Sequence, residues 1–186
     1  DDGISDWVND ETSHNFSQNQ YVIIHCLEPG KLKESITAAG YDYKEMQNLK
    51  VTGELVTEDF WFMSSEMESL RHLNLSNVTV KNAWVGHNED LDMDIYADDV
   101  IPTNAFYGNK TIRSIVLPTS IKSICRDAFR EMQLMNTTLV IPEGVTEISG
   151  AFLYNEYNNV ELVLPQTIES LGGFRDCNWK CKFNLS

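Results

Sequence analysis

One acidic segment carries the residue types that bind calcium. Residues 88–94 read Asn-Glu-Asp-Leu-Asp-Met-Asp, and alternating carboxylates of this kind supply the oxygen ligands that calcium prefers. The weak candidate ligands are Asp90, Asp92 and Asp94. The segment does not match an EF-hand loop, because Ile95 stands at the position of the turn glycine and Ile101 at that of the bidentate glutamate. We therefore favour a solvated acidic loop and predict no metal site.

His25 and Cys26 are the residue types of a nucleophile pair, but they are neighbours in one apolar run. Adjacent residues on a strand point to opposite faces, so these two side chains are not expected to share a site. The four cysteines lie in separate contexts, which predicts free and mostly buried thiols. The chain has no His-Glu-x-x-His motif, no Gly-x-Ser-x-Gly motif and no phosphate-binding glycine loop. We predict a protein that is not an enzyme and that binds no cofactor.

Aromatic side chains stack on sugar rings when two of them share an exposed surface. The candidates are Trp7, Trp61, Trp84, Trp179, Tyr154 and Tyr157. Nothing in the sequence places two of them together, so packing in the core is the default. Glycan binding is the alternative, and a pair of coplanar exposed rings would favour it.

Composition excludes several classes of partner. The 186 residues include 14 Lys and Arg against 28 Asp and Glu, and the net charge of −14 repels nucleic acids and anionic lipid heads. No apolar run approaches the roughly 18 residues of a membrane span. The first residues are acidic, unlike a signal peptide. We expect no nucleic-acid partner, and membrane contact only through a removed or missing anchor.

The elements that would position a site repeat with a period near 23 residues. Phe106, Phe129, Phe152 and Phe174 are spaced 23, 23 and 22 residues apart, and alanine precedes the first three. A second column is Leu117-Pro118, Ile141-Pro142 and Leu164-Pro165, a third is Ile121, Val145 and Ile168, and a fourth is Ile124, Ile148 and Leu171. Four columns at one period indicate stacked repeat units.

Each unit predicts one strand of a parallel sheet. The apolar runs 115–117, 139–141 and 162–164 each end at a proline, which cannot donate to a strand ladder. One unit alone buries too little apolar surface to offset its chain entropy, so the units must stack. The predicted fold is an α/β repeat solenoid of the leucine-rich-repeat type. It has a parallel sheet on one face, short helical or irregular connections, and a small N-terminal α+β cap.

The chain divides into a cap and a repeat array. Residues 1–47 are interpreted as an N-terminal tail with a strand and a short helix, and residues 48–186 as the array. Within the array, an irregular acidic turn is expected near 85–100 and strict repeats at 101–186. A further helix is predicted from Thr57 to Leu70, with Thr57 as its N-cap.

These columns resemble the BspA-like leucine-rich-repeat family of bacterial surface proteins. Cys177, three residues after Phe174, matches the Phe-x-x-Cys position common in that family, and the other units have Asn109, Met132 and Asn155 there. The resemblance covers roughly residues 20 to 186. It implies a protein that is exported or lipid-anchored, found outside the cell or on its surface, and involved in adhesion to host proteins or other cells.

The leucine-rich-repeat fold predicts which side chains face outward on the sheet. Residues that alternate with the buried ones form one row, with a second row beside it. The first row is Lys50, Asn74, Val116, Val140, Val163 and Asn184, and the second is His72, Ser114, Thr138, Glu161 and Lys182. The binding candidates are His72, Asn74, Ser114, Val116, Thr138, Val140, Glu161 and Val163. Three stacked valines would mark a protein-binding patch, or valine merely suits a strand there.

The leading hypothesis is a non-catalytic module that binds a host or bacterial surface protein through the concave sheet. A glycan-binding accessory domain and a structural spacer are the alternatives.

Overall fold

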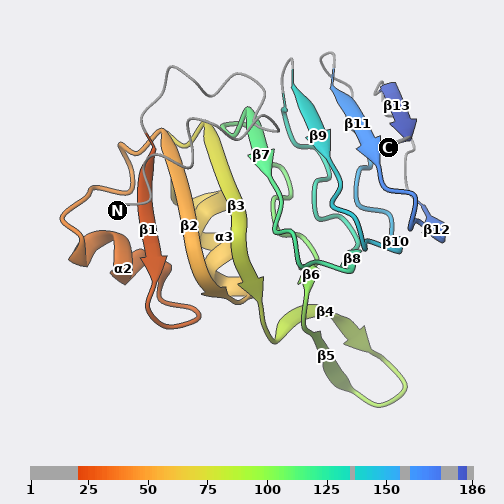
Figure 1. The fold of residues 1–186 in the computed structure, drawn as a ribbon. Helices are drawn as coiled ribbons and strands as arrows, with labels where there is room; N and C mark the ends of the chain where they lie inside the picture. Colours follow the sequence, from red (N-terminus) through yellow and green to blue (C-terminus); the bar gives the residue numbers. More distant parts are fainter. Residues whose placement is uncertain (1–20, 135–136, 156–159, 173–179, 184–186) are drawn as a thin grey trace.

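The computed structural model describes residues 21–134, 137–155 and 160–172, and the backbone of 180–183 (Figure 1). The first elements are β1 (Val22–Cys26), α2 (Leu32–Ala38), β2 (Asn48–Leu55), α3 (Thr57–Ser65), β3 (His72–Val80), β4 (Ala83–Asn88), β5 (Met93–Ala97) and β6 (Val100–Ile101). The later elements are β7 (Ser114–Val116), β8 (Ser123–Ile124), β9 (Thr138–Val140), β10 (Glu147–Ile148), β11 (Glu161–Leu164), β12 (Ser170–Leu171) and β13 (Lys180–Phe183).

Parallel strands form one side of the molecule. The hydrogen-bonded order is β1-β2-β3-β7 in one sheet and β9-β11-β13 in the next, with β7 packed beside β9 (Figure 1). The predicted strands at 115–117, 139–141 and 162–164 are confirmed to within one residue at each end. A proline follows each of β7, β9 and β11 within two residues, where the chain leaves the sheet.

The connections between these strands are themselves extended. Two-residue strands form another parallel sheet in the order β12-β10-β8-β6. The fourth apolar column supplies the buried Ile124 and Ile148 to it, whereas Leu171 of that column is exposed. After α3, the described residues contain no helix. Of the two kinds of connection expected, helical ones occur between β1 and β2 and between β2 and β3, and the later connections are irregular, with short strands and turns.

Phe106, Phe129 and Phe152 each lie in a turn between two strands, and we call these three turns the aromatic turns. Their stacked rings fill the interior. The Phe106 and Phe129 ring centroids are 5.6 Å apart and the Phe129 and Phe152 centroids 5.2 Å apart, with interplanar angles of 16° and 7°. All three side chains are fully buried. Phe60 of α3 packs edge-on against Phe106 at 5.9 Å, so the helix closes one end of the stack.

Asn109, three residues after Phe106, ties the first aromatic turn to α3. Its Oδ1 accepts hydrogen bonds from the backbone of Thr111 and Ile112, and its Nδ2 donates to the Ser64 carbonyl at 2.8 Å. A buried polar side chain needs such partners, and here they connect two elements. Cys177, at the corresponding position of the last unit, lies outside the described residues.

The N-terminal strand and helices pack directly on the array. β1 pairs with β2 along five residues, and the Asp59 carboxylate accepts backbone N–H groups of Gly30, Leu32 and Val56. Asp59 thereby holds the start of α2 against the start of α3. The N-cap of α3 is Val56, not Thr57 as predicted, and α3 ends at Ser65 because residues 66–70 turn toward β3.

The acidic segment is ordered. Residues 83–97, most of which were expected to form an irregular turn, make an antiparallel hairpin of β4 and β5 that projects from the end of β3 (Figure 1). Thr57 anchors its base, because the Thr57 Oγ1 accepts the Trp84 backbone N–H at 2.6 Å. The expectation of an irregular loop was wrong, since Asp92-Met93-Asp94-Ile95 alternates as a strand does.

Neither helix of the described part of the chain has the length and hydrophobicity needed to cross a membrane.

Candidate binding surface

The strand registers assemble the predicted outward row. Lys50 pairs with Asn74 and Asn74 with Val116, while Val140 pairs with Val163. We call the sheet face that carries this row, opposite the core side chains, the open face. The register also adds Ile23 of β1, which lies opposite Lys50 and is exposed. The sequence did not assign Ile23, because its pattern does not reveal which strand pairs with β1.

The members of the row differ in accessibility. Val140 is 47% exposed and Val116 is half-buried, whereas Val163 is buried at 9%. Asn74 is also buried, and its Oδ1 accepts the Ser76 backbone N–H at 2.9 Å. The apolar patch available to a partner therefore centres on Val140 and Val116 rather than on three equal valines.

The flanking row contains a polar pair of the half-buried His72 and the buried Ser114. His72 Nδ1 lies 2.7 Å from the Ser114 Oγ across β3 and β7, and Ser114 is buried. Burial lowers the pKa of His72 below its ordinary value, and the nearby charge of Arg71 acts in the same direction. The two other candidates, Thr138 and Glu161, are opposite each other on β9 and β11 and half-buried.

The last strand is shifted from its predicted register. Lys182 is opposite Val163, and Lys180 is opposite Glu161. The sequence assigned Asn184 and Lys182 to those positions because it placed the strand two residues further along. β13 ends at Phe183, and Asn184 lies outside the described residues.

The candidate calcium ligands Asp90, Asp92 and Asp94 do not gather into one cluster in the described part of the chain. Within the described residues, no group of three or more His, Cys, Asp or Glu side chains could hold an ion. Asp92 and Asp94 instead contact His87, at 3.5 Å and 3.2 Å, and Asp94 also accepts the Trp84 indole N–H at 3.1 Å. These hydrogen bonds, that of Trp84 first, lower the pKa of Asp94.

His25 and Cys26 point to opposite faces, as predicted. His25 is exposed and its Nδ1 lies 3.0 Å from the Thr52 Oγ1, whereas the Cys26 Sγ donates to the Glu28 carbonyl. Burial raises the pKa of Cys26 to about 11, with a smaller contribution from the charge of Asp59. Burial also raises the pKa of the free thiol of Cys125 to about 11. Neither thiol is a ready nucleophile at neutral pH.

The structure brings two of the candidate aromatics together. Trp61 of α3 and Trp84 of β4 have ring centroids 6.4 Å apart, but their planes meet at 63°. On the aromatic turns, the exposed Tyr107 and Tyr154 flank the Arg130 guanidinium, whose carbon lies 5.4 Å and 4.9 Å from the two ring centroids. Among the described residues, the nearly coplanar ring pairs are the buried phenylalanines.

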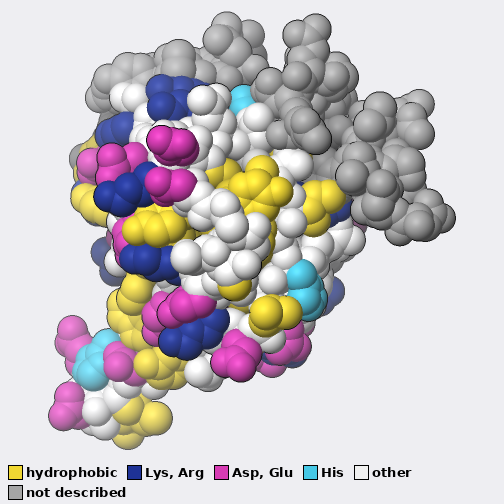
Figure 2. Space-filling view, turned by 90° about the vertical axis from the view of Figure 1, so that its left-hand side faces the viewer, with side chains coloured by type: hydrophobic (Ala, Val, Ile, Leu, Met, Phe, Trp, Pro, Cys, Tyr) yellow, Lys and Arg dark blue, Asp and Glu magenta, His cyan; other side chains and the backbone are white. Residues whose placement is uncertain are grey.

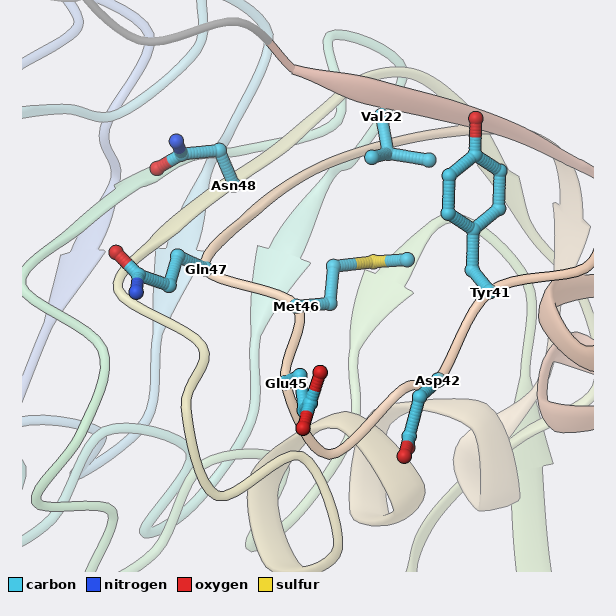
Figure 3. A pocket seen from close by; sticks show the side chains of 7 residues that line it. All are labelled: Val22, Tyr41, Asp42, Glu45, Met46, Gln47 and Asn48. Carbon is cyan, nitrogen blue, oxygen red and sulfur yellow. The ribbon is translucent and has the colours of Figure 1, made fainter.

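A hollow of about 380 Å³ opens where β1 and β2 begin (Figure 3). Its lining residues are Val22, Tyr41, Asp42, Glu45, Met46, Gln47 and Asn48. Figure 3 shows an apolar group of Val22, Tyr41 and Met46, with the carboxylates of Asp42 and Glu45 to one side. The Asp42 carboxylate accepts the Lys44 backbone N–H, so it helps to shape this loop. The lining has no histidine, cysteine or lysine, and we assign no chemistry to it.

Comparison with protein families gives one match. Residues 99–185 match the family model for the BspA type leucine rich repeat region, in six copies. No curated protein matches the chain. The match confirms the family resemblance seen in the apolar columns. It begins after the hairpin and does not extend to the upstream residues 20–98, for which the resemblance stays a prediction.

Proposed function

Because residues 99–185 match the family model for the BspA type leucine rich repeat region, we propose that this chain is a non-catalytic module that holds a protein partner on its open face. Repeats of this type suggest protein-binding or surface modules, and the family is generally non-catalytic. The observation that supports this site most is the exposure of Val140 on β9, which packs beside β7 with its half-buried Val116, on a row that β3 and β2 continue. Exposed apolar side chains within a polar surround often mark a partner site.

The polar surround of this patch suits a protein partner. The half-buried Thr138 and Glu161 lie beside Val140, and further along the face the polar His25 and the apolar Ile23 lie exposed on β1. Because β1, β2, β3 and β7 are hydrogen-bonded in one sheet and β9 and β11 in the next, the backbone under these side chains is ordered before binding and loses little conformational entropy. We further propose that the protein is secreted or surface-tethered and that its partner is a host or bacterial surface protein. Sequencing the unprocessed N-terminus would test the export signal.

Two matched substitutions test the open face. The partner that the full chain captures from extracellular-matrix extract or from bacterial cells is purified, and its Kd is measured against Val140→Glu and Leu171→Glu. These residues are 47% and 45% exposed but lie on opposite sheets. We expect Val140→Glu, alone or with Val116→Glu, to weaken binding about tenfold or more and Leu171→Glu to leave it unchanged. Equal Kd values for folded V140E and L171E would contradict the proposal.

Glycan binding is a second candidate, and one observation favours it. Tyr107 and Tyr154 are both exposed, and their contact with Arg130 holds them in fixed positions on the aromatic turns. Tyrosine rings stack on sugars, and rigid rings do so at low entropic cost. A glycan array on which the wild type binds and Tyr107→Ala does not would support this candidate, and an array without hits would count against it.

A further inference from the structure

The β4–β5 hairpin carries a surface that neither the repeat stack nor the open face uses. Figures 1 and 2 both show it as a projection at the bottom of the molecule, and Figure 2 shows hydrophobic and acidic side chains together on it. The hairpin interrupts the repeat period, because it separates β3 from β6 and β7.

The hairpin is held in place at its base and at its tip. At the base, Thr103 Oγ1 donates to the Val85 carbonyl at 2.7 Å, and Asp98 accepts the Asn82 backbone N–H at 2.8 Å. At the tip, Asn88 Oδ1 accepts the Leu91 backbone N–H at 3.0 Å. Two-stranded hairpins are marginal alone, so these contacts matter for keeping the projection ordered.

Its two faces differ in chemistry. Trp84, His87 and Asp94 are joined by hydrogen bonds and therefore share one face. Met93 and Ile95 flank Asp94 along β5 and so lie on the other face. With Leu91 and Tyr96, they give four large apolar side chains in six residues, each between 43% and 67% exposed. This density of exposed apolar groups is typical of a docking surface.

The charge of the hairpin defines the kind of partner. Residues 82–99 contain six acidic side chains and no lysine or arginine. A second copy of this chain would bring two such surfaces together, and like charges at close range repel. A positively charged segment complements the surface. The aliphatic parts of its lysine and arginine side chains can cover Met93 and Ile95, while their charged groups meet the carboxylates.

We propose that the hairpin docks a basic, extended segment of a partner protein, with Met93 and Ile95 as its apolar contacts and the surrounding carboxylates as its charge contacts. The hairpin surface is separate from the open face. One partner can therefore contact both surfaces, or different partners can contact one surface each. Two linked contacts raise the overall affinity without strengthening either one.

An eight-residue peptide of alternating lysine and valine tests the proposal, with the glutamate–valine peptide as its control. Amide shifts of the labelled full chain locate each peptide, and titration gives Kd. We expect shifts at Leu91–Tyr96 with the lysine peptide alone, about tenfold weaker binding to Met93→Ser/Ile95→Ser, and unchanged binding to Val140→Ser on the open face. Glu89→Gln/Asp90→Asn should reduce the dependence of Kd on salt.

Equal binding of both peptides, shifts confined to the open face, or no hairpin shift at 1 mM peptide would overturn the proposal. If the serine variant loses its native circular dichroism, the Glu89→Gln/Asp90→Asn variant still decides, because it changes charge at two exposed turn residues. An effect of Val140→Ser on the peptide would assign the binding to the open face instead. Failure of the open-face proposal, tested by Val140→Glu, leaves this result unaffected.

Discussion

His72 lies at the border of the open face, where its surroundings determine its charge. The Ser114 hydroxyl is 2.7 Å from the ring, and burial disfavours the protonated form. At neutral pH the imidazole is therefore neutral, and the His72–Ser114 pair presents hydrogen-bonding atoms rather than charge. The proposed partner would therefore meet hydrogen-bonding atoms at this position rather than a positive charge.

The lowered pKa of His72 predicts a pH dependence of stability. The unfolded chain takes up a proton near pH 6.5 while the folded chain still resists it, so the free energy of unfolding falls as pH decreases through that region. Chemical denaturation at pH 7.5, 6.5 and 5.5 should show this loss in the wild type and less of it in His72→Gln. His25→Gln, at an exposed position, serves as the control. An identical pH profile for His72→Gln and wild type would contradict the assignment.

The outward row shows how far residues can be predicted from sequence. Alternation along each strand identifies Val116, Val140 and Val163, and the observed registers place them as expected. Their exposure does not follow from alternation, because it depends on what packs above each strand. Asn74 is an example: its side chain bonds to the Ser76 backbone and is buried.

The aromatic turns repeat their backbone conformation as well as their side chains. Positive φ angles between 56° and 64° recur at Asn104, Asp127 and Gly150, and angles between 55° and 68° recur at Gly108, Glu131 and Tyr154. Each set has the 23-residue period. A left-handed residue at both ends of the turn lets Phe106 and its successors point inward at the same place in each unit.

Substitution of Gly108 measures how much the left-handed backbone conformation at the end of an aromatic turn contributes to stability. An added Cβ would meet nothing within 4 Å, so steric packing cannot explain any loss, whereas its φ of 68° disfavours other residues. We expect Gly108→Ala to lower the free energy of unfolding by about 1–2 kcal/mol. Gly172→Ala, with ordinary contacts and no left-handed φ, should change it by less than about 0.5 kcal/mol. Equal effects in urea denaturation would contradict a conformational cause.

The hairpin was the element that sequence reasoning missed. Its turn, Glu89-Asp90-Leu91-Asp92, has none of the Asn-Gly or Asp-Gly pairs that announce a tight hairpin. The alternation in β5 was the available signal, but the high density of carboxylates favoured the interpretation as a solvated acidic loop. The end of α3 was also missed, because the apolar Met67 and Leu70 continue the helical spacing while packing from a turn.

Across the whole molecule, the 23-residue period was sufficient to predict the stacking of the units. The strands, the parallel pairing and the buried phenylalanine column all follow from it. The packing of the first unit against α3 does not follow, because Phe60 and Asn109 lie in unlike segments. Contacts between the repeats and the non-repeating α3 produce no periodic pattern in the sequence, so they cannot be predicted from it.

Phe129 tests whether the units stabilise one another. It packs between Phe106 and Phe152, so its removal opens a cavity at the boundary of two units. We expect Phe129→Ala to cost about 3–5 kcal/mol in unfolding free energy. Hydrogen exchange should then show β9 and β11 opening before β1–β3. Tyr107→Ala, which removes an exposed ring, should lower the free energy of unfolding by less than about 1 kcal/mol and leave the order in which the strands open as in the wild type. Uniform loss of protection in Phe129→Ala would contradict this coupling.

Hydroxyl-radical footprinting of the chain with and without its captured partner tests the central claim most directly, because it reports on side chains at both sheets at once. Val140 and Leu171 are similarly exposed in the free chain and serve as internal comparisons. The account predicts that the partner protects Val140 and Ile23 and leaves Leu171 reactive. Protection of Leu171 with Val140 still reactive would contradict binding at the open face.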